Sequence, residues 1–112
     1  MSSDCIFCRI VAGEIPSRKV YEDDELIAFH DIRPAAAVHF MIVPKMHLDS
    51  LADARPAEEG LLGRILLLAP VLAKEQGLAD GFRTIINTGR GGGQEVMHLH
   101  VHVMGGGPLR PM

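Results

Sequence analysis

The segment that most constrains this chain covers residues 98–104 and reads His-Leu-His-Val-His-Val-Met. Histidines alternate there with apolar residues, and three of the six histidines in the chain lie in it. Because successive side chains of a β-strand point to opposite faces, this alternation predicts a strand with three imidazoles on one face. Leu99, Val101 and Val103 are expected to pack on the other face. Chance or a solvated strand edge explains this pattern poorly, so it indicates a functional site.

Length and composition narrow the class of protein. With 112 residues, 47% of them hydrophobic, the chain is expected to form one domain over residues 1–112. The net charge is −3 and no basic stripe is present, which argues against a nucleic-acid partner. No segment approaches the roughly 20 apolar residues of a membrane span, and the N-terminus lacks the order of a signal peptide. We therefore expect a cytoplasmic protein with no membrane partner.

Two helices are expected from the spacing of apolar residues and helix-ending residues. A short helix is predicted over residues 5–12, capped by Asp4 and ended by Gly13. A long helix is predicted over residues 56–76, and Pro70 should kink or split it, because proline removes a backbone donor and crowds the preceding turn.

The long helix is apolar on nearly all sides. Between Leu61 and Leu72 only Arg64 is charged. A helix of this kind is buried on more than one side, which in so small a chain indicates a partner subunit. The other patterns predict strands, and together with the helices they indicate an α+β fold with a mainly antiparallel sheet. The strands are expected at residues 19–22, 26–29, 39–44, 82–87 and 98–104.

The three alternating histidines favour catalysis over a shared metal ion. Three consecutive positions on one face of a strand span about 13 Å at ~3.3 Å per residue, which is too far for a single ion. Two of them could still bind one ion together with a ligand from another element. A neutral imidazole is also a competent nucleophile near neutral pH. We therefore consider both a nucleophilic histidine and a zinc-dependent hydrolase.

The segment before the histidines, residues 88–95, is rich in glycine. Glycines let backbone amides approach an anion closely, so this loop is a candidate phosphate-binding nest, although many such loops are only turns. Asp31 follows an apolar strand, and its carboxylate suits either a sugar hydroxyl or a turn cap.

Cys5 and Cys8 are separated by two residues. Such a pair is compatible with two core cysteines, with a redox pair, or with half of a four-ligand zinc site. In the third case His47 and His98 are the candidates for the remaining ligands. The site would then tie the N-terminal helix to the start of the histidine strand.

These segments together resemble the histidine triad (HIT) family, and within it the HINT branch. The likeness extends over nearly the whole chain. It is carried by residues 5–10, 14–16, 28–32, 39–40, 43–47, 87, 92–96 and 98–106. The resemblance implies a five-stranded antiparallel sheet with one main helix and a short N-terminal helix. It also implies a homodimer.

The resemblance further implies hydrolysis of purine nucleoside 5′-monophosphoramidates to AMP and an amine, with no cofactor required for catalysis. His100 would attack the α-phosphorus, His102 would bind the phosphate and assist the leaving group, and His98 and His39 would support them. Asp31 would bind the ribose hydroxyls. The base and the phosphate would be held by Ile6, Phe7, Ile10, Phe29, Ile32, Asn87, Gly93, Gln94, Glu95 and Val96.

The chain departs from the family pattern at several positions. Glu95 stands where some relatives have a serine that offers its hydroxyl to the phosphate, so only the backbone amide of Glu95 is expected to serve. Met97 replaces an aromatic residue, and the tail lacks the tryptophan of animal members. The cysteine pair is present in part of the family only. In the related uridylyltransferase branch a similar pair and two histidines hold structural zinc, which implies zinc on Cys5, Cys8, His47 and His98.

Two other functions stay open at this point. One is a nucleotide-binding regulatory or interaction protein with weak hydrolysis. The other is a sibling chemistry on the same histidines, such as a dinucleoside polyphosphate hydrolase or a nucleotide phosphorylase.

Overall fold

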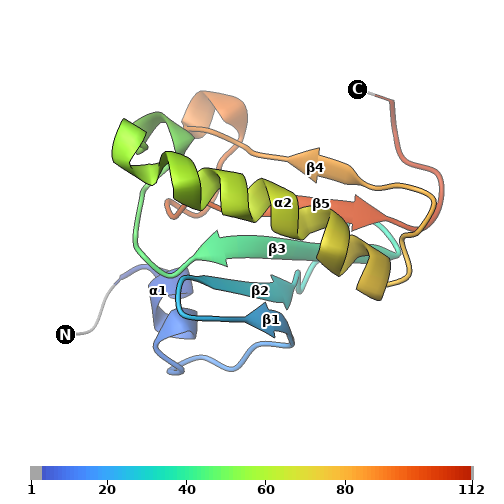
Figure 1. Ribbon diagram of the computed structural model, residues 1–112, viewed down its shortest axis with the longest axis horizontal. Helices are drawn as coiled ribbons and strands as arrows, with labels where there is room; N and C mark the ends of the chain where they lie inside the picture. The colour runs from blue at the N-terminus through green and yellow to red at the C-terminus, as the bar shows by residue number, and fades with distance from the viewer. Residues whose placement is uncertain (1–3, 112) are drawn as a thin grey trace.

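Five antiparallel strands form the sheet of this protein, whose structure is a computed structural model that describes residues 4–111 (Figure 1). Residues 1–3 and 112 of the expected domain lie outside the described part. The strand order is β1-β2-β3-β5-β4, and every neighbouring pair is antiparallel, as predicted. The strands are β1 (Lys19–Glu22), β2 (Leu26–His30), β3 (Val38–Pro44), β4 (Arg83–Ile85) and β5 (Val101–Gly105).

The central strand β3 separates two apolar cores. Its side chains alternate between the faces of the sheet, so Phe40 and Ile42 join one core while Met41 and Val43 join the other. The first core lies under the long helix α2 (Glu59–Glu75), and the second lies under the short helix α1 (Ile6–Val11). β3 is therefore buried on both faces of the sheet.

Helix α1 begins at Ile6, one residue later than predicted, and its cap differs from the prediction. The N-cap is Cys5, whose sulfur accepts the backbone N–H of Cys8, so Asp4 does not cap this helix. Gly13 follows the helix with a φ of +80°, a conformation that favours glycine, and it ends the helix as expected.

Helix α2 is preceded by a 3₁₀ turn, η2 (Pro56–Glu58), which accounts for the first residues of the predicted long helix. Pro70 lies inside α2 without splitting it. Leu66, Leu67 and Val71 of this helix are exposed. The homodimer stays a prediction, because the structure contains one chain.

Within residues 4–111 no helix is long and apolar enough to cross a membrane.

The predicted histidine strand is only partly a strand, because β5 begins at Val101. The backbone N–H groups of His98 and Leu99 donate to Val96 and Leu48 instead of to a neighbouring strand. β3 ends at Pro44, whose carbonyl is taken by the imidazole of His98. His98 therefore does not share the strand face on which His102 lies. The predicted strand over residues 82–87 is likewise shorter, so Asn87 lies in the following loop.

Candidate active site

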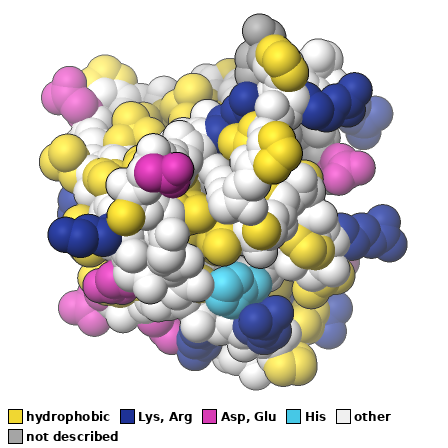
Figure 2. Space-filling model, turned by 90° about the vertical axis from the view of Figure 1, so that its right-hand side faces the viewer, with side chains coloured by type: hydrophobic (Ala, Val, Ile, Leu, Met, Phe, Trp, Pro, Cys, Tyr) yellow, Lys and Arg dark blue, Asp and Glu magenta, His cyan; other side chains and the backbone are white. Residues whose placement is uncertain are grey.

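A cavity of about 810 Å³ opens on the α1 side of the sheet. It is lined by three of the four predicted catalytic histidines, His39, His100 and His102, and not by His98. Ten of the eleven predicted nucleotide-binding residues also line it, the exception being Gln94. Figure 2 views the end of the molecule at which β2 and β5 finish, where histidine surface lies next to basic and hydrophobic side chains.

The cavity also contains residues that sequence reasoning missed. Met41 is one, although it pairs with Phe29 across β2 and β3, so the strand register could have identified it. The others belong mainly to the segment before β1 and to the loop after β2, where no periodicity marks a binding residue. They are Ile15, Pro16, Ser17, Arg18, His30, Arg33 and Pro34.

His100 is buried and has a defined orientation. Its Nδ1 lies 2.7 Å from the carbonyl oxygen of His98. Because a carbonyl only accepts, Nδ1 carries the proton in this hydrogen bond, and in the neutral ring Nε2 keeps a lone pair. Phe7 packs edge-on against the ring at a centroid distance of 5.1 Å. His100 therefore offers an unprotonated Nε2 in a wall of the cavity.

His39 and His102 are joined by a hydrogen bond whose direction is also determined. The backbone N–H of Ala35 donates to Nδ1 of His39 at 3.0 Å, so the proton of a neutral His39 is on Nε2. That Nε2 lies 2.9 Å from Nδ1 of His102 and donates to it. His102 therefore keeps its own proton on Nε2. A lone pair on His100 and an N–H on His102 thus belong to neighbouring rings, whose centroids are 4.9 Å apart.

Burial favours the neutral forms of His39 and His102. It lowers the pKa of His39, an effect that the carboxylate of Asp31 opposes. The pKa of His102 falls to about 4, mainly through burial and further through the neighbouring His100 and His39 rings. Burial also lowers the pKa of His98. The direction of the hydrogen bond derived above for neutral His39 and His102 therefore holds near pH 7.

The depressed pKa of His102 predicts a loss of stability in acid. In the unfolded chain this imidazole binds a proton as the pH falls below about 6.5, whereas in the folded protein it resists protonation down to about 4. Its stabilising contribution is thus present above pH 6.5 and is lost as the pH falls towards 4. We expect His102→Gln to lose less thermal stability than wild type between pH 7 and pH 5. Equal losses would contradict this, and Lys74→Gln should behave as wild type.

Asp31 lies at the cavity wall and already holds its own loop. Its Oδ1 accepts the backbone N–H of Arg33 at 2.8 Å, and its Oδ2 lies 3.5 Å from Nε2 of His39. The position of Asp31 is therefore compatible with both roles considered from the sequence, binding a sugar hydroxyl and capping a turn. Close by, Ile32 lines the cavity with 92% of its surface exposed, so a bound base would cover it.

The glycine-rich loop is held in place by the buried side chain of Gln94. Its Oε1 accepts the backbone N–H of Gly89 at 2.8 Å, and its Nε2 donates to the carbonyls of Asp49 and Val96. These bonds explain why the Gln94 side chain does not line the cavity. It supports the loop whose residues Gly93, Glu95 and Val96 do.

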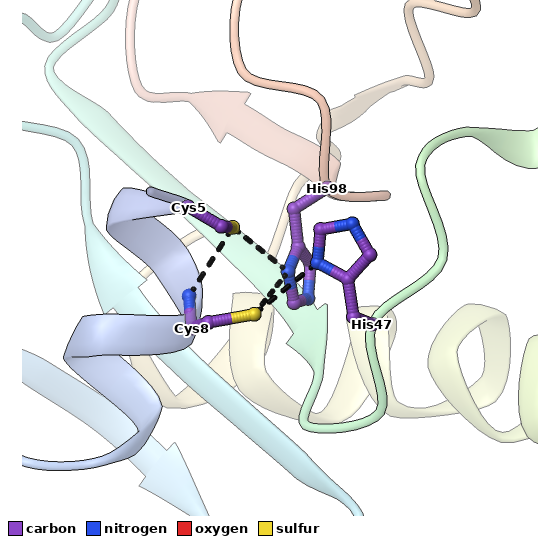
Figure 3. Close-up of side chains that lie close together, drawn as sticks. All are labelled: Cys5, Cys8, His47 and His98. Atoms are coloured by element: carbon purple, nitrogen blue, oxygen red, sulfur yellow. Dashed lines mark hydrogen bonds between the residues drawn. The ribbon is translucent and has the colours of Figure 1, made fainter. Parts of the chain in front are cut away.

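A second cluster lies beside the cavity and joins α1 to the segment before β5 (Figure 3). Nδ1 of His98 is 3.3 Å from the sulfur of Cys5 and 3.5 Å from that of Cys8. Nδ1 of His47 is 3.2 Å from the sulfur of Cys8. The four predicted zinc ligands are thus brought together, with all four ligand atoms within 4.8 Å of one another.

The hydrogen bonds around this cluster suit a metal ion. Nε2 of His98 donates to the carbonyl of Pro44 at 2.8 Å, and Nε2 of His47 donates to the carboxylate of Asp49 at 2.6 Å. Both rings therefore turn an Nδ1 lone pair towards the two sulfurs. Zinc-binding histidines characteristically donate their other N–H to a carbonyl or carboxylate in this way. Two thiolates and two imidazoles also match the ligand set of structural zinc sites.

Asp31, His39 and His102 form a second group whose ligand atoms lie within 4.8 Å of one another. Its chemistry fits a metal ion poorly. His39 would bind through Nε2, which requires the proton to move to Nδ1, but Nδ1 already accepts the N–H of Ala35. An ion here would break that hydrogen bond. The tautomer of His39 therefore makes this group a poorer metal site than the cluster of Cys5, Cys8, His47 and His98.

The antiparallel sheet and the histidine-lined cavity define the candidate site, and comparison with known proteins identifies the family and its class of activity. The HIT domain matches residues 12–109 of the chain. The chain therefore belongs to the HIT family, and it is a hydrolase of that family.

Two curated relatives are similar over almost their full length. Protein HitA of Neisseria gonorrhoeae is 58% identical, over 91% of this chain and 95% of that protein. The purine nucleoside phosphoramidase of Escherichia coli K12 is 45% identical, over 100% of this chain and 95% of that protein.

Solved structures show the same fold. A histidine triad protein from Clostridium difficile is 48% identical with a TM-score of 0.94, and the match covers 100% of this chain and 98% of that one. A histidine triad family protein from Mycobacterium smegmatis, described as zinc-bound, is 35% identical with a TM-score of 0.79, over 90% and 73% of the two chains.

Proposed function

We propose that this hydrolase cleaves the P–N bond of purine nucleoside 5′-monophosphoramidates and releases AMP, or the corresponding purine nucleotide, and an amine. The observation that carries this proposal is the orientation of His100, whose unprotonated Nε2 belongs to the wall of a cavity that also contains the glycine-rich loop. The similarity to a purine nucleoside phosphoramidase supports the choice of substrate.

The proposed reaction has two steps. Nε2 of His100 attacks the α-phosphorus and forms a nucleotidyl-histidine as the P–N bond of the substrate breaks, and the leaving nitrogen takes up a proton from solvent and departs as the amine. Water then attacks the same phosphorus, the bond between phosphorus and His100 breaks and restores the imidazole, and the proton lost by water returns to solvent. The Nε2–H of His102 donates to a phosphoryl oxygen or to the leaving nitrogen, and His39 keeps that proton on Nε2. His98 acts through its carbonyl, which holds the His100 ring.

The rest of the cavity holds the nucleotide. Its apolar wall fits the base and consists of Ile6, Phe7, Ile10, Phe29 and Ile32. Backbone amides near Gln94, Glu95 and Val96, together with Asn87 and Gly93, receive the phosphate. In this proposal the phosphorus lies beside His100 and the ribose beside Asp31.

A turnover panel tests the proposal. Purified protein is given adenosine and guanosine 5′-phosphoramidates and, separately, diadenosine polyphosphates. We expect the amidates to be hydrolysed with the higher kcat/KM. A higher value for the polyphosphates would favour the dinucleoside polyphosphate hydrolase, and negligible turnover of every substrate would favour a nucleotide-binding regulatory protein.

Asp31→Asn should weaken substrate binding without disturbing the loop, because the amide oxygen can still accept the N–H of Arg33. Replacing a charged acceptor by a neutral one costs a ribose hydroxyl bond about 1–1.5 kcal/mol, so we expect KM to rise about 10-fold. With a 2′,3′-dideoxyadenosine amidate the two proteins should have the same KM. A 10-fold difference on that substrate as well would contradict ribose binding by Asp31.

We also propose that Cys5, Cys8, His47 and His98 hold a structural zinc ion. Bound there, zinc would cross-link α1, the segment after β3 and the segment before β5, and it would take no part in the chemical step.

The exposed face formed by Leu66, Leu67 and Val71 supports a homodimer through α2, which sedimentation can measure.

A further inference from the structure

A second groove, of about 480 Å³, adjoins the nucleotide cavity. The two hollows share three wall residues, Ile6, Glu95 and Val96, so they adjoin along this wall. The rest of the groove is lined by Asp4, Met97 and two of the proposed zinc ligands, Cys5 and His47. Neither the nucleotide pocket nor the proposed zinc site accounts for Asp4 and Met97.

The groove adjoins the phosphate end of the cavity. Of the residues that we assign to the nucleoside, Ile6 lines both hollows, whereas Phe29, Asp31 and Ile32 line the first cavity only. Glu95 and Val96, which follow the glycine-rich loop, line both. A nucleotide with its base at the first end therefore has its phosphorus towards the shared wall. The leaving amine, which is the second substituent on that phosphorus, would then point into the groove.

The negative charge of Glu95 is unfavourable in a site that binds only an anion. Its side chain is exposed and, among the residues that the structure describes, makes no hydrogen bond or ion pair. A carboxylate about 4 Å from a phosphate opposes binding by roughly 1 kcal/mol even in water. A positive charge on the substrate would remove that cost. Asp4, also exposed, adds a second carboxylate to the groove.

The groove also offers apolar surface. Ile6 and Met97 expose 45% and 41% of their surfaces, which suits a short chain of methylene groups. We propose that Glu95 makes this protein selective for phosphoramidates whose leaving group is an alkylamine ending in a second ammonium group. The methylenes lie along Ile6 and Met97, and the ammonium group pairs with the carboxylate of Glu95. This inference rests on the phosphoramidate hydrolysis proposed above.

Two substrates of equal size test the selectivity. They are adenosine 5′-phosphoramidates of 1,4-diaminobutane and of n-pentylamine, which differ in whether the chain ends in ammonium or methyl. For wild type at low salt we expect kcat/KM to be about 2- to 5-fold higher with the diamine, the usual scale for an exposed ion pair. The ratio should fall towards 1 in 0.5 M salt, because salt screens an exposed pair.

Variants at Glu95 locate the source of the ratio. Glu95→Gln keeps the shape and removes the charge, so the ratio should fall to about 1, and Glu95→Lys should reverse it in favour of n-pentylamine. Glu75→Gln removes an exposed carboxylate of α2 outside both hollows and should keep the wild-type ratio. The measure is a ratio within each protein, so a change in overall activity does not affect it.

The outcomes separate this inference from the proposed function. A wild-type ratio near 1, with both amidates hydrolysed, overturns the selectivity and leaves the hydrolysis intact. A wild-type preference that persists in Glu95→Gln overturns the assignment to Glu95. Failure of wild type to hydrolyse either amidate defeats the proposed function and this inference together.

Discussion

Replacing His100 by alanine is expected to lower kcat/KM for an adenosine phosphoramidate by about 10⁴-fold or more, the usual scale for loss of a nucleophile. Neither His39 nor the other two histidines of the triad can take its place in the geometry observed. Nε2 of His39 carries a proton and donates to His102, and Nδ1 of His102 is occupied by that bond. The lone pair of His98 faces the cysteines, outside the cavity.

His100→Asn provides the structural control. Its amide N–H can replace Nδ1 as the donor to the carbonyl of His98, but it has no nucleophilic ring nitrogen. We expect this variant to unfold at nearly the wild-type temperature and to be as inactive as His100→Ala. Acid quenching during turnover should trap a nucleotidyl group on wild type and none on either variant. An alanine variant that keeps its turnover would show that another group attacks the phosphorus.

Removing the metal is expected to have the largest effect on stability. Wild type should be purified with about one zinc ion per chain, and Cys8→Ser with far less. A ligand present at about 1,000 times its Kd adds roughly 4 kcal/mol, which for a chain of this size corresponds to a fall in Tm on the order of 10–20 °C when it is lost. The cluster joins three segments that are distant in sequence, so its loss should lower the thermal stability of the whole domain.

A chelator distinguishes metal loss from a simple packing defect. It should lower the Tm of wild type to about that of Cys8→Ser and leave the variant unchanged. Lys74→Gln, an exposed change on α2, should respond to the chelator as wild type does. A wild-type protein that is purified without metal and whose Tm is insensitive to the chelator would mean that the four residues form a metal-free hydrogen-bonded cluster.

Local patterns were sufficient to predict much of the fold. The apolar run of β3 and the alternation of β5 follow directly from the faces of a sheet, and Gly13 ends α1 because its positive φ favours glycine. The start of α1 was predicted less well. Asp4 is the residue type that usually caps a helix, but the sulfur of Cys5 has that position. Pro70 was expected to kink or split α2, and the helix continues through it without being split.

The sequence by itself determined the mainly antiparallel sheet, because alternation and turn residues are local properties of the chain. The nucleotide-binding residues were predicted from the resemblance to the HIT family, and eight further residues that line the cavity were not predicted. Only the tertiary structure decided what each histidine of the triad faces. His98 turns to Cys5 and Cys8 because the carbonyl of Pro44 accepts its other nitrogen. His102 keeps its proton on Nε2 because the N–H of Ala35 sets the tautomer of His39. Those partner atoms come from segments more than 50 residues away from the triad, so no local pattern of residues 98–104 could reveal them.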